Sequence, residues 1–329
     1  MRARRHLRLV QGGVSSVEPL RAPGVLRLAE ALPPDGRTAR RRAPASCGEL
    51  IRGTLESGEF LLNCPIDFHA QATVRALPCA GLSARTPEAE TDCTEAIERF
   101  ARAQGVGVRH ELRLSTRIPR GRGLAAEAAG LTAALDAFAQ CNGLDRDPVV
   151  HGRTLAEAGF CHGLHLPGVA HVDPLSGAAR ESLPPPRDLR VLVLDCAAEV
   201  DAECYDRDRA RALHRANRPL LMAALAGLRV GLRGGDLRLV AEAATQSTLL
   251  DHRILPRPQL HPLLALAHAA GALGINCAHG GTVLGVLYRR GDVVADALAE
   301  KIDRAFGSCL ELVGDFAAIG GGCRDATLG

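Results

Sequence analysis

Tryptophan is absent from this sequence, and aromatic residues of all kinds make up only 3% of its 329 residues. The core must therefore be built from aliphatic side chains, for which a hydrophobic content of 47% is ample. No apolar run is long enough to span a bilayer, and residues 1–42 lack the apolar stretch of a signal peptide. The sequence thus predicts a cytoplasmic protein without a membrane partner.

Lysine is almost absent as well. Lys301 is the only lysine, and arginine supplies nearly all the positive charge. The formal net charge is only +3, which is small for a domain that binds nucleic acid through its charge. We therefore expect no nucleic-acid partner.

Paired cysteine spacing is the third missing feature. The chain has 11 cysteines, an odd number, and no CxxC pair occurs among them. Zinc sites and disulfide frameworks require such paired spacing. We therefore expect the cysteines to be free thiols.

Strand-like and helix-like patterns are mixed along the chain, without the regular repetition of a doubly wound sheet. This mixture predicts an α+β fold. Residues 1–42, rich in Arg, Pro and Gly, are expected to form a flexible basic leader. The proline cluster at 184–186 marks the predicted boundary between domains 43–186 and 187–329. The patterns predict strands at 59–77 (interrupted by Pro65), 108–119, 191–196 and the end of 275–288, and helices at 95–105, 124–143, 148–159, 206–228, 236–255, 262–274 and 291–307.

The stretch "IPRGRGLAAEAAG" at 118–130 has the features of a phosphate-binding loop that leads into a helix. Gly121 and Gly123 allow a tight turn and a close approach of the backbone to a ligand. The start of the helix then offers unpaired N–H groups and the positive end of its dipole. By itself this pattern also fits an ordinary connection between a strand and a helix.

Two further glycine-containing stretches accompany this loop, "ASCGELIRG" at 45–53 and "GALGINCAHGGTVLGVLY" at 271–288. Together with "CPIDFHA" at 64–70 and the segments 166–183 and 244–260, they resemble the motifs of the GHMP kinases. Within that superfamily the chain is most similar to the L-threonine kinases of cobalamin side-chain synthesis. The similarity covers about residues 45–312.

The resemblance implies a two-domain GHMP kinase fold, with an N-terminal domain like domain 2 of ribosomal protein S5 and a ferredoxin-like C-terminal domain. It implies ATP and Mg²⁺ as cofactors and a small hydroxyl-bearing acceptor as the other partner, and a homodimer is compatible with it. The residues matched to the ATP loop are Pro119, Gly121, Gly123, Leu124, Ala125 and Ala126. Those matched to the acceptor site are Ser46, Cys47, Glu49, Asp67, His279, Gly280, Gly281 and Thr282.

The chain departs from the family motifs at several positions. Ala126 and Glu127 stand where the second motif carries two serines, one of which helps to hold Mg²⁺. Gly280 stands where the third motif carries a serine. The segment that usually contains an aspartate reads "GFCHGLHLPG" at 159–168 and has no carboxylate.

Three residues are candidates for the roles that these departures leave open. Glu127 either replaces a serine as a Mg²⁺ ligand or only stabilises the start of its helix. His162 is a general base, part of a transition-metal patch, or an ordinary member of a polar loop. Asp173, the nearest carboxylate after the altered segment, could stand in for the missing base. The metal patch would comprise Cys161, His162, His165 and His171.

Other motif residues also keep two interpretations. Asp67 either pairs with a nearby arginine or contacts the substrate. Ser46 and Glu49 either serve the acceptor pocket or are a turn residue and a charge at the edge of a strand. His279 lies inside a matched motif and is expected to shape the acceptor pocket.

Two functions follow from the sequence. The first is an ATP-dependent kinase that phosphorylates the hydroxyl of an amino-acid-like acceptor, L-threonine or a relative. The alternative is a protein of the same fold that has lost phosphotransfer and acts as a regulatory or binding subunit, or as an enzyme of different chemistry. The glycine loops favour the first, and the altered serine and aspartate positions favour the second.

Overall fold

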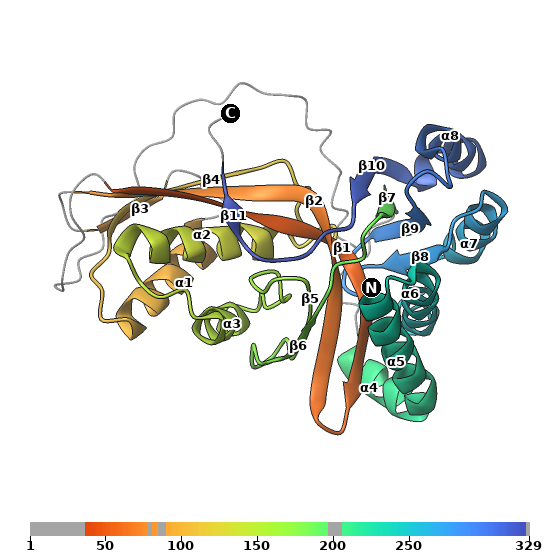
Figure 1. Cartoon of the computed structure of the whole chain (residues 1–329), viewed down its shortest axis with the longest axis horizontal. Helices are drawn as coiled ribbons and strands as arrows, with labels where there is room; N and C mark the ends of the chain where they lie inside the picture. Colours follow the sequence, from red (N-terminus) through yellow and green to blue (C-terminus); the bar gives the residue numbers. More distant parts are fainter. Residues whose placement is uncertain (1–36, 78–80, 85–89, 197–205, 327–329) are drawn as a thin grey trace, which may run out of the picture.

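The computed structural model describes residues 37–77, 81–84, 90–196 and 206–326. A long antiparallel hairpin, β1 (Thr38–Leu55) and β2 (Gly58–Ala76), runs through the middle of the molecule (Figure 1). The other described strands are β3 (Gly81–Ala84), β4 (Arg109–Thr116), β5 (Val169–Val172), β6 (Ala179–Leu183), β7 (Leu189–Asp195), β8 (Gly274–Cys277), β9 (Val283–Arg289), β10 (Glu311–Ala317) and β11 (Arg324–Asp325). The described helices are α1 (Glu90–Ala103), α2 (Ala126–Asn142), α3 (Pro148–Glu157), α4 (Arg207–Ala216), α5 (Arg218–Gly234), α6 (Leu237–Asp251), α7 (Leu260–Ala269) and α8 (Ala295–Phe306), with a short 3-10 turn, η2 (Gly307–Cys309), after the last.

All the described strands belong to one sheet, in the order β10-β7-β9-β8-β1-β2-β4-β3, with β5, β6 and β11 attached at its side. Most neighbouring pairs are antiparallel, and β3 runs parallel to β4. On one side of the hairpin, α2 packs on β1, β2 and β4, and α1 and α3 pack on α2. On the other side, α6 packs on β1 and β8, and α5 packs on α6. This arrangement confirms the predicted α+β fold.

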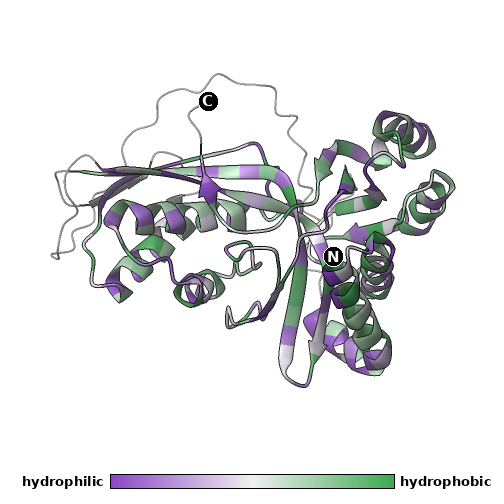
Figure 2. Cartoon of the chain, in the orientation of Figure 1, coloured by the Kyte–Doolittle hydropathy of each residue, from purple (hydrophilic) through white to green (hydrophobic). Residues whose placement is uncertain are grey.

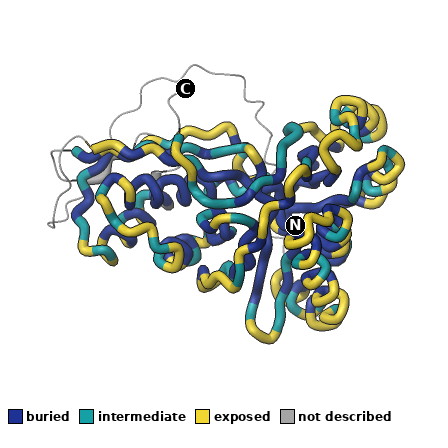
Figure 3. The backbone as a smooth tube through the Cα atoms, in the orientation of Figure 1, coloured by how far each residue is buried: buried dark blue, intermediate teal, exposed yellow. Residues whose placement is uncertain are grey.

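One hydrophobic core links the two sides. It joins Leu50 and Phe60 of the hairpin to Ala128 of α2, Leu228 of α5 and Val240 of α6. The tube view shows the backbone of the hairpin buried where it passes between the two groups of helices (Figure 3). The outer helices α5 to α8 carry both hydrophobic and hydrophilic residues, as expected of helices that cover a sheet and face solvent (Figure 2). The helices on both sides therefore pack against the same β1–β2 hairpin.

Helix α2 is the most deeply buried helix next to the predicted phosphate loop. Nearly all its residues are buried, because the helix is enclosed between the sheet and two other helices. Its alanine-rich composition suits this position. It ends at Gly143, which has a φ of 66° and donates its N–H to Ala139 and Gln140. The predicted end of this helix at 142–143 is confirmed.

Several predicted boundaries are wrong. The leader was expected to extend to residue 42, but β1 begins at Thr38, because Arg41 is buried and paired with Asp136 and Asp325. Residues 1–36 lie outside the described part. The helix expected at 206–228 is two helices, separated at Asn217 before Pro219. The strand expected to break at Pro65 continues through it.

Three further predictions concern the domain boundary, the cysteines and membrane-spanning helices. The proline cluster at 184–186 lies between β6 and β7, and its role as a domain boundary stays a prediction. The cysteines in the described residues are free, and Cys79 and Cys204 lie outside them. Within the described residues, no helix combines the length and apolarity needed to cross a membrane.

The three glycine-containing loops meet through their backbones. The carbonyl oxygen of Arg122, in the loop between β4 and α2, accepts hydrogen bonds from the N–H groups of Thr282 (2.9 Å) and Val283 (3.1 Å). The N–H of Ser46, in β1, donates to the Leu124 carbonyl (3.1 Å). Segments that lie far apart in the sequence are therefore fixed side by side.

The absence of side chains makes this contact possible. A Cβ on Gly281 would lie 2.5 Å from both the Arg122 carbonyl oxygen and the Gly123 Cα. A Cβ on Gly123 would lie 2.3 Å from the Cβ of Ala278. These distances are far shorter than van der Waals contact, so the loops can pack this closely only as glycine.

We expect Gly281→Ala to lower the free energy of unfolding by about 1–3 kcal/mol, because the methyl group must push two backbones apart. The neighbouring Gly280→Ala is the matched control, because a Cβ there would meet no atom within 4 Å. Urea unfolding should show Gly280→Ala as stable as the wild type or slightly more so. Equal destabilisation by both substitutions would contradict the proposed loop contact.

The buried Arg41 gives a second stability prediction. Its guanidinium pairs with Asp136 of α2, which is 12% exposed, and with Asp325 of β11, which is 83% exposed. Asp136→Asn should cost about 3 kcal/mol of unfolding free energy, because it leaves a buried cation poorly compensated. Asp325→Asn should cost less than about 1 kcal/mol, because that carboxylate is solvated. Denaturant unfolding of the two variants tests this, and similar losses for both would refute it.

Candidate active site

A cleft of about 450 Å³ opens where the three loops meet. The sheet, the start of α2 and the loop before β9 all contribute to its walls. The lining residues are Ser46, Gly48, Glu49, Arg52, Asn63, Gly121, Gly123, Ala125, Glu127, Ala128, Gly159, Phe160, His162, Ala278 and Gly280. Eight of the residues named from the sequence are among them, so the predicted motifs do converge on one site.

The loop before α2 presents backbone to this cleft. Gly121 and Gly123 have positive φ values of 68° and 91°, and a Cβ on Gly121 would meet no atom within 4 Å. Ala125, the residue before α2, is held in the left-handed region with a φ of 57°, and no side chain caps the helix. Such a helix start carries N–H groups and the positive dipole end, which suit an anion.

The six residues matched to the ATP loop do not all reach the cleft. Gly121, Gly123 and Ala125 line it. Ala126 lines an adjoining, mainly apolar pocket of about 50 Å³ that shares Glu127 and Phe160 with the cleft. Leu124 is buried in the core, where its side chain anchors the loop, and Pro119 is not among the lining residues of either hollow. The remaining residues that line the apolar pocket are Ala70, Cys93, Leu114, Ser115, Thr116, Arg120 and Gly130.

Glu127 lies in the first turn of α2 and faces both hollows. Its carboxylate accepts a hydrogen bond from Nε of Arg120, with 3.0 Å between Nε and Oε1. Both side chains are partly exposed, so this pair is one that an incoming ligand can exchange. Whether Glu127 holds a metal stays a prediction, and as a ligand it would have to leave Arg120.

His162 lies in the cleft wall between groups of opposite charge. Burial lowers its pKa, the carboxylates of Glu49 and Glu127 raise it, and the charge of Arg52 lowers it. The net effect places the pKa below the ordinary value of 6.5. Asn63 donates from Nδ2 to the His162 carbonyl oxygen (2.7 Å) and holds the segment in place. A neutral imidazole in this position is able to accept a proton.

The transition-metal patch, one of the three alternatives for His162, does not form among the described residues. Cys161 is buried, and His171 lies against the Phe60 ring and 3.5 Å from Glu181. Among the described residues, the His, Cys, Asp and Glu atoms that cluster at metal-ligand spacing are those of Asp251, Cys277 and His279.

Glu49 and His279 form a buried pair behind the cleft. One carboxylate oxygen of Glu49 accepts from both the backbone N–H of His279 (3.1 Å) and its Nδ1 (2.9 Å). Burial alone would raise the pKa of Glu49, but His279 and the charge of Arg52 outweigh it and lower the pKa to about 2. Glu49 is therefore ionised and shapes the cleft wall through its contact with the third loop.

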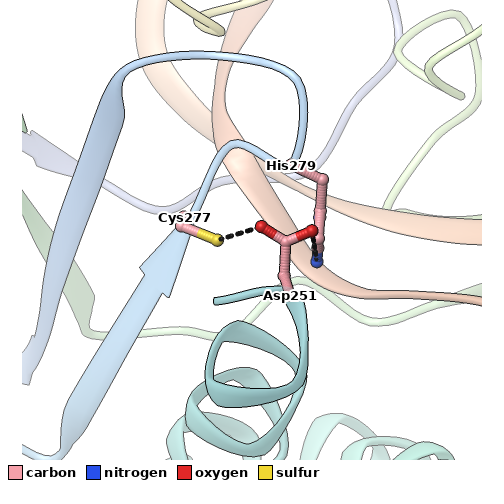
Figure 4. Close-up of side chains that lie close together, drawn as sticks. All are labelled: Asp251, Cys277 and His279. Atoms are coloured by element: carbon pink, nitrogen blue, oxygen red, sulfur yellow. Dashed lines mark hydrogen bonds and ion pairs between the residues drawn. The ribbon is translucent and has the colours of Figure 1, made fainter. Parts of the chain in front are cut away.

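Asp251, at the end of α6, lies between Cys277 and His279 (Figure 4). Its Oδ2 accepts from the Cys277 thiol (3.7 Å), and its Oδ1 lies 3.9 Å from Nε2 of His279. Arg257 pairs with the same carboxylate (2.7 Å) and donates to the carbonyl of Ala278 (2.6 Å). The guanidinium of Arg257 already neutralises this carboxylate. The cluster is therefore better suited to holding the third loop in place than to binding a cation.

Besides Asp67, four of the residues matched to the acceptor site lie outside the cleft lining. The Cys47 thiol is fully buried and points to Asn276 (3.8 Å), so its role is structural. The Thr282 hydroxyl is buried and donates to Asp195. Gly281 packs against the 119–125 loop, as described above, and His279 acts through Glu49.

Asp67 and Asp173 require correction as site residues. Asp67 is exposed on β2 and lies 3.4 Å from His69. Asp173 caps the turn after β5, where its Oδ1 accepts from the N–H groups of Leu175 (2.9 Å) and Ser176 (3.3 Å). Local turn chemistry accounts for this aspartate, so it is no longer a candidate for the base.

Among the lining residues with polar or aromatic side chains, sequence analysis missed three. Arg52 lies inside the matched "ASCGELIRG" stretch, and its charge was the available signal. Asn63 precedes the "CPIDFHA" stretch and reaches the cleft because it pairs with Glu49 across the hairpin. Phe160 lies in the altered segment and carried no signal for a role in the cleft.

Comparison with curated proteins finds two L-threonine kinases of moderate similarity. No protein-family model matches the chain. An L-threonine kinase of Salmonella typhimurium is 27% identical over 265 residues, which is 79% of this chain and 87% of that protein. An L-threonine kinase of Citrobacter freundii is 25% identical over 258 residues, which is 76% of this chain and 86% of that protein.

Solved structures share the fold over most of their length. A homoserine kinase from Cytophaga hutchinsonii has a TM-score of 0.68 at 19% identity, covering 88% of this chain and 97% of that one. The Methanococcus jannaschii mevalonate kinase has a TM-score of 0.64 at 11% identity, covering 89% and 100%. A mevalonate diphosphate decarboxylase from Staphylococcus aureus has a TM-score of 0.64 at 13% identity, covering 89% and 98%. These similarities show that the chain has the α+β fold of the GHMP kinase structures, and that its sequence resembles those of L-threonine kinases.

Proposed function

We propose that the chain is an ATP- and Mg²⁺-dependent kinase that phosphorylates the hydroxyl of a small amino-acid-like acceptor, L-threonine or a close relative. The observation that carries the proposal is the meeting of the glycine loops at one cleft, next to a helix start without a side-chain cap. The L-threonine kinases that the chain resembles support an acceptor of this kind.

The residues present fit a nucleotide. Gly121 leaves open space beside the start of α2, where backbone N–H groups would bind the phosphates. The adjoining apolar pocket at Leu114, Gly130 and Phe160 suits the flat face of a nucleobase. Glu127 and the Ser46 hydroxyl offer oxygen ligands for Mg²⁺, which would neutralise phosphate charge when bound.

Phosphoryl transfer depends mainly on positioning and on charge stabilisation. The acceptor oxygen attacks the terminal phosphorus, the bond to the bridging oxygen breaks, and ADP leaves. The hydroxyl proton passes to a ring nitrogen of His162, which is neutral near pH 7 because burial lowers its pKa. This assignment replaces Asp173, whose carboxylate is occupied in a turn.

The alternative is a protein of this fold that binds ligands without transferring phosphate, or that performs different chemistry. Its support is the pairing of the cleft carboxylates, Glu127 with Arg120 and Glu49 with His279. Proteins named as decarboxylases share the fold, so the fold by itself does not select the reaction.

Incubation with ATP, Mg²⁺ and L-threonine, followed by ³¹P NMR, decides between the two functions. A new phosphate monoester signal with stoichiometric ADP supports the kinase. Tight ATP binding without transfer to L-threonine, L-serine or L-homoserine supports the alternative.

We expect Glu127→Gln to weaken the Mg²⁺ dependence of ATP binding by about tenfold or more, which corresponds to about 1.4 kcal/mol. The reason is that the amide is a poorer Mg²⁺ ligand than the carboxylate. Calorimetric titration with ATP in Mg²⁺ and in EDTA measures this dependence. Glu127→Ser should retain it, and Glu242→Gln, on the exposed side of α6, is the control. ATP binding of equal strength in EDTA and Mg²⁺ by the wild type would rule out the metal role.

His162→Gln should lower kcat by about 10²–10⁴-fold with little change in nucleotide affinity, if the imidazole is the base. The pH profile gives a second readout. Because the pKa of His162 lies below 6.5, the wild-type rate should stay level between about pH 8 and 7 and fall as the imidazole becomes protonated at lower pH. A variant that keeps the wild-type rate would exclude His162 as the base.

A further inference from the structure

The sheet carries a second groove on the face turned away from α2. In Figure 1, α1, α2 and α3 lie on one side of β2 and β4, and no described helix lies on the other side. Arg41 of β1 points toward α2, where it pairs with Asp136. Because neighbouring residues of a strand point to opposite faces, Arg40 and Arg42 point to the face without helices. A groove of about 250 Å³ lies there and shares no lining residue with the active-site cleft.

Basic and hydrogen-bonding side chains line this groove. They come from β1, β2 and the end of β4, and none of them is acidic: Arg42, Phe68, His69, Gln71, Ser115, Thr116 and Arg117. Arg42, Gln71 and Ser115 lie opposite one another across the three strands. On its other side, Arg42 lies opposite Arg324 of β11. Like charges placed directly opposite each other destabilise a sheet, so this part of the sheet favours an anion.

Arg42 and Arg117 are both without a partner for their charge among the described residues. No hydrogen bond or ion pair joins either guanidinium to another described residue. Nε of Arg42 and Nε2 of His69 are buried without a hydrogen-bond partner, which costs free energy unless a ligand or water binds them. The neighbouring carboxylate, Asp67, is exposed and lies 3.4 Å from Nδ1 of His69. Burial and the charges of Arg42 and Arg324 still lower the pKa of His69, so positive charge dominates the groove.

We propose that this groove binds a small phosphate-bearing molecule at a site separate from the active-site cleft. Its two guanidinium groups balance the roughly two negative charges of a phosphate monoester and present paired N–H donors to the phosphate oxygens. The amide of Gln71 and the hydroxyls of Ser115 and Thr116 add further donors. Phe68, whose ring stacks on that of Phe316 with 5.0 Å between centroids, gives an apolar wall for the organic part of the ligand.

The experiment measures binding of phenyl phosphate by calorimetry at about 0.15 M salt, which screens long-range attraction. We expect Arg42→Gln and Arg117→Gln each to weaken binding by about 10-fold or more, because each removes a charged hydrogen-bond donor. The matched control is Arg40→Gln, which removes the same charge from the same face of β1 outside the groove. It should change the affinity by less than about twofold. Phenol, which has the ring without the phosphate, should not bind.

Ser115 and Thr116 also line the apolar pocket beside the cleft, so binding in the nucleotide site is tested separately. Displacement of phenyl phosphate by a saturating non-hydrolysable ATP analogue with Mg²⁺ would overturn the inference. No binding by the wild type, equal weakening in all three variants, or binding of phenol as tight as that of phenyl phosphate would also overturn it.

The melting temperatures of the ligand-free variants show whether weaker binding reflects the groove or a loss of folding. Arg42→Gln should melt at or above the wild-type temperature, because it removes one of two opposed like charges. Arg117→Gln, at an exposed position after β4, gives the same binding test outside the strands. A chain without kinase activity would leave the inference standing, since binding in this groove uses no step of phosphoryl transfer.

Discussion

The hydrogen bonds between the Arg122 carbonyl and the N–H groups of Thr282 and Val283 are the contact on which the site depends. They join the loop before α2 to the loop before β9 without any side chain between them. Gly123 and Gly281 make this approach possible, since a Cβ at either position would overlap the opposite loop. The position of the helix start, the floor of the cleft and the location of Ala278 and Gly280 all follow from this backbone contact.

A buried ion pair supports the same contact from behind. Arg257 and Asp251 are each about 1% exposed, and the guanidinium also donates to the carbonyls of Ala278 and Gly281. Charges buried this deeply are tolerated only when they are paired and hydrogen-bonded. Each donor of Arg257 that reaches the loop therefore restricts where the third motif can lie, which makes the loop a rigid part of the cleft.

Pairing is a general feature of the charged groups around the cleft. Glu49 pairs with His279, Glu127 with Arg120, and Asp195 with Arg122 (3.2 Å). The first of these pairs is buried, whereas the second is partly exposed. An anionic ligand can therefore exchange with the Arg120–Glu127 pair at little cost, while the Glu49–His279 pair keeps its geometry. The site thus combines a fixed wall with an adjustable entrance beside the phosphate loop.

The sequence determined the loops, because the requirement they meet is local. A positive φ or a close backbone approach restricts a position to glycine, so Gly121, Gly123 and Gly281 can be recognised from residue type and spacing. The end of α2 at Gly143 was predictable for the same reason. Local information failed at Asp173, because an aspartate that caps a turn and a catalytic aspartate look the same in the sequence. The structure shows that this aspartate caps a turn.

The tertiary structure decided which side chains meet. Glu49 contacts His279 across 230 positions of sequence, and Arg52 and Asn63 enter the cleft because β1 and β2 pair in one particular register. Arg41 is a further example. Its arginine-rich surroundings in the sequence predicted a flexible leader, but in the structure it is buried and paired with Asp136 of α2. Such encounters depend on packing between distant elements, which the type and spacing of neighbouring residues do not specify.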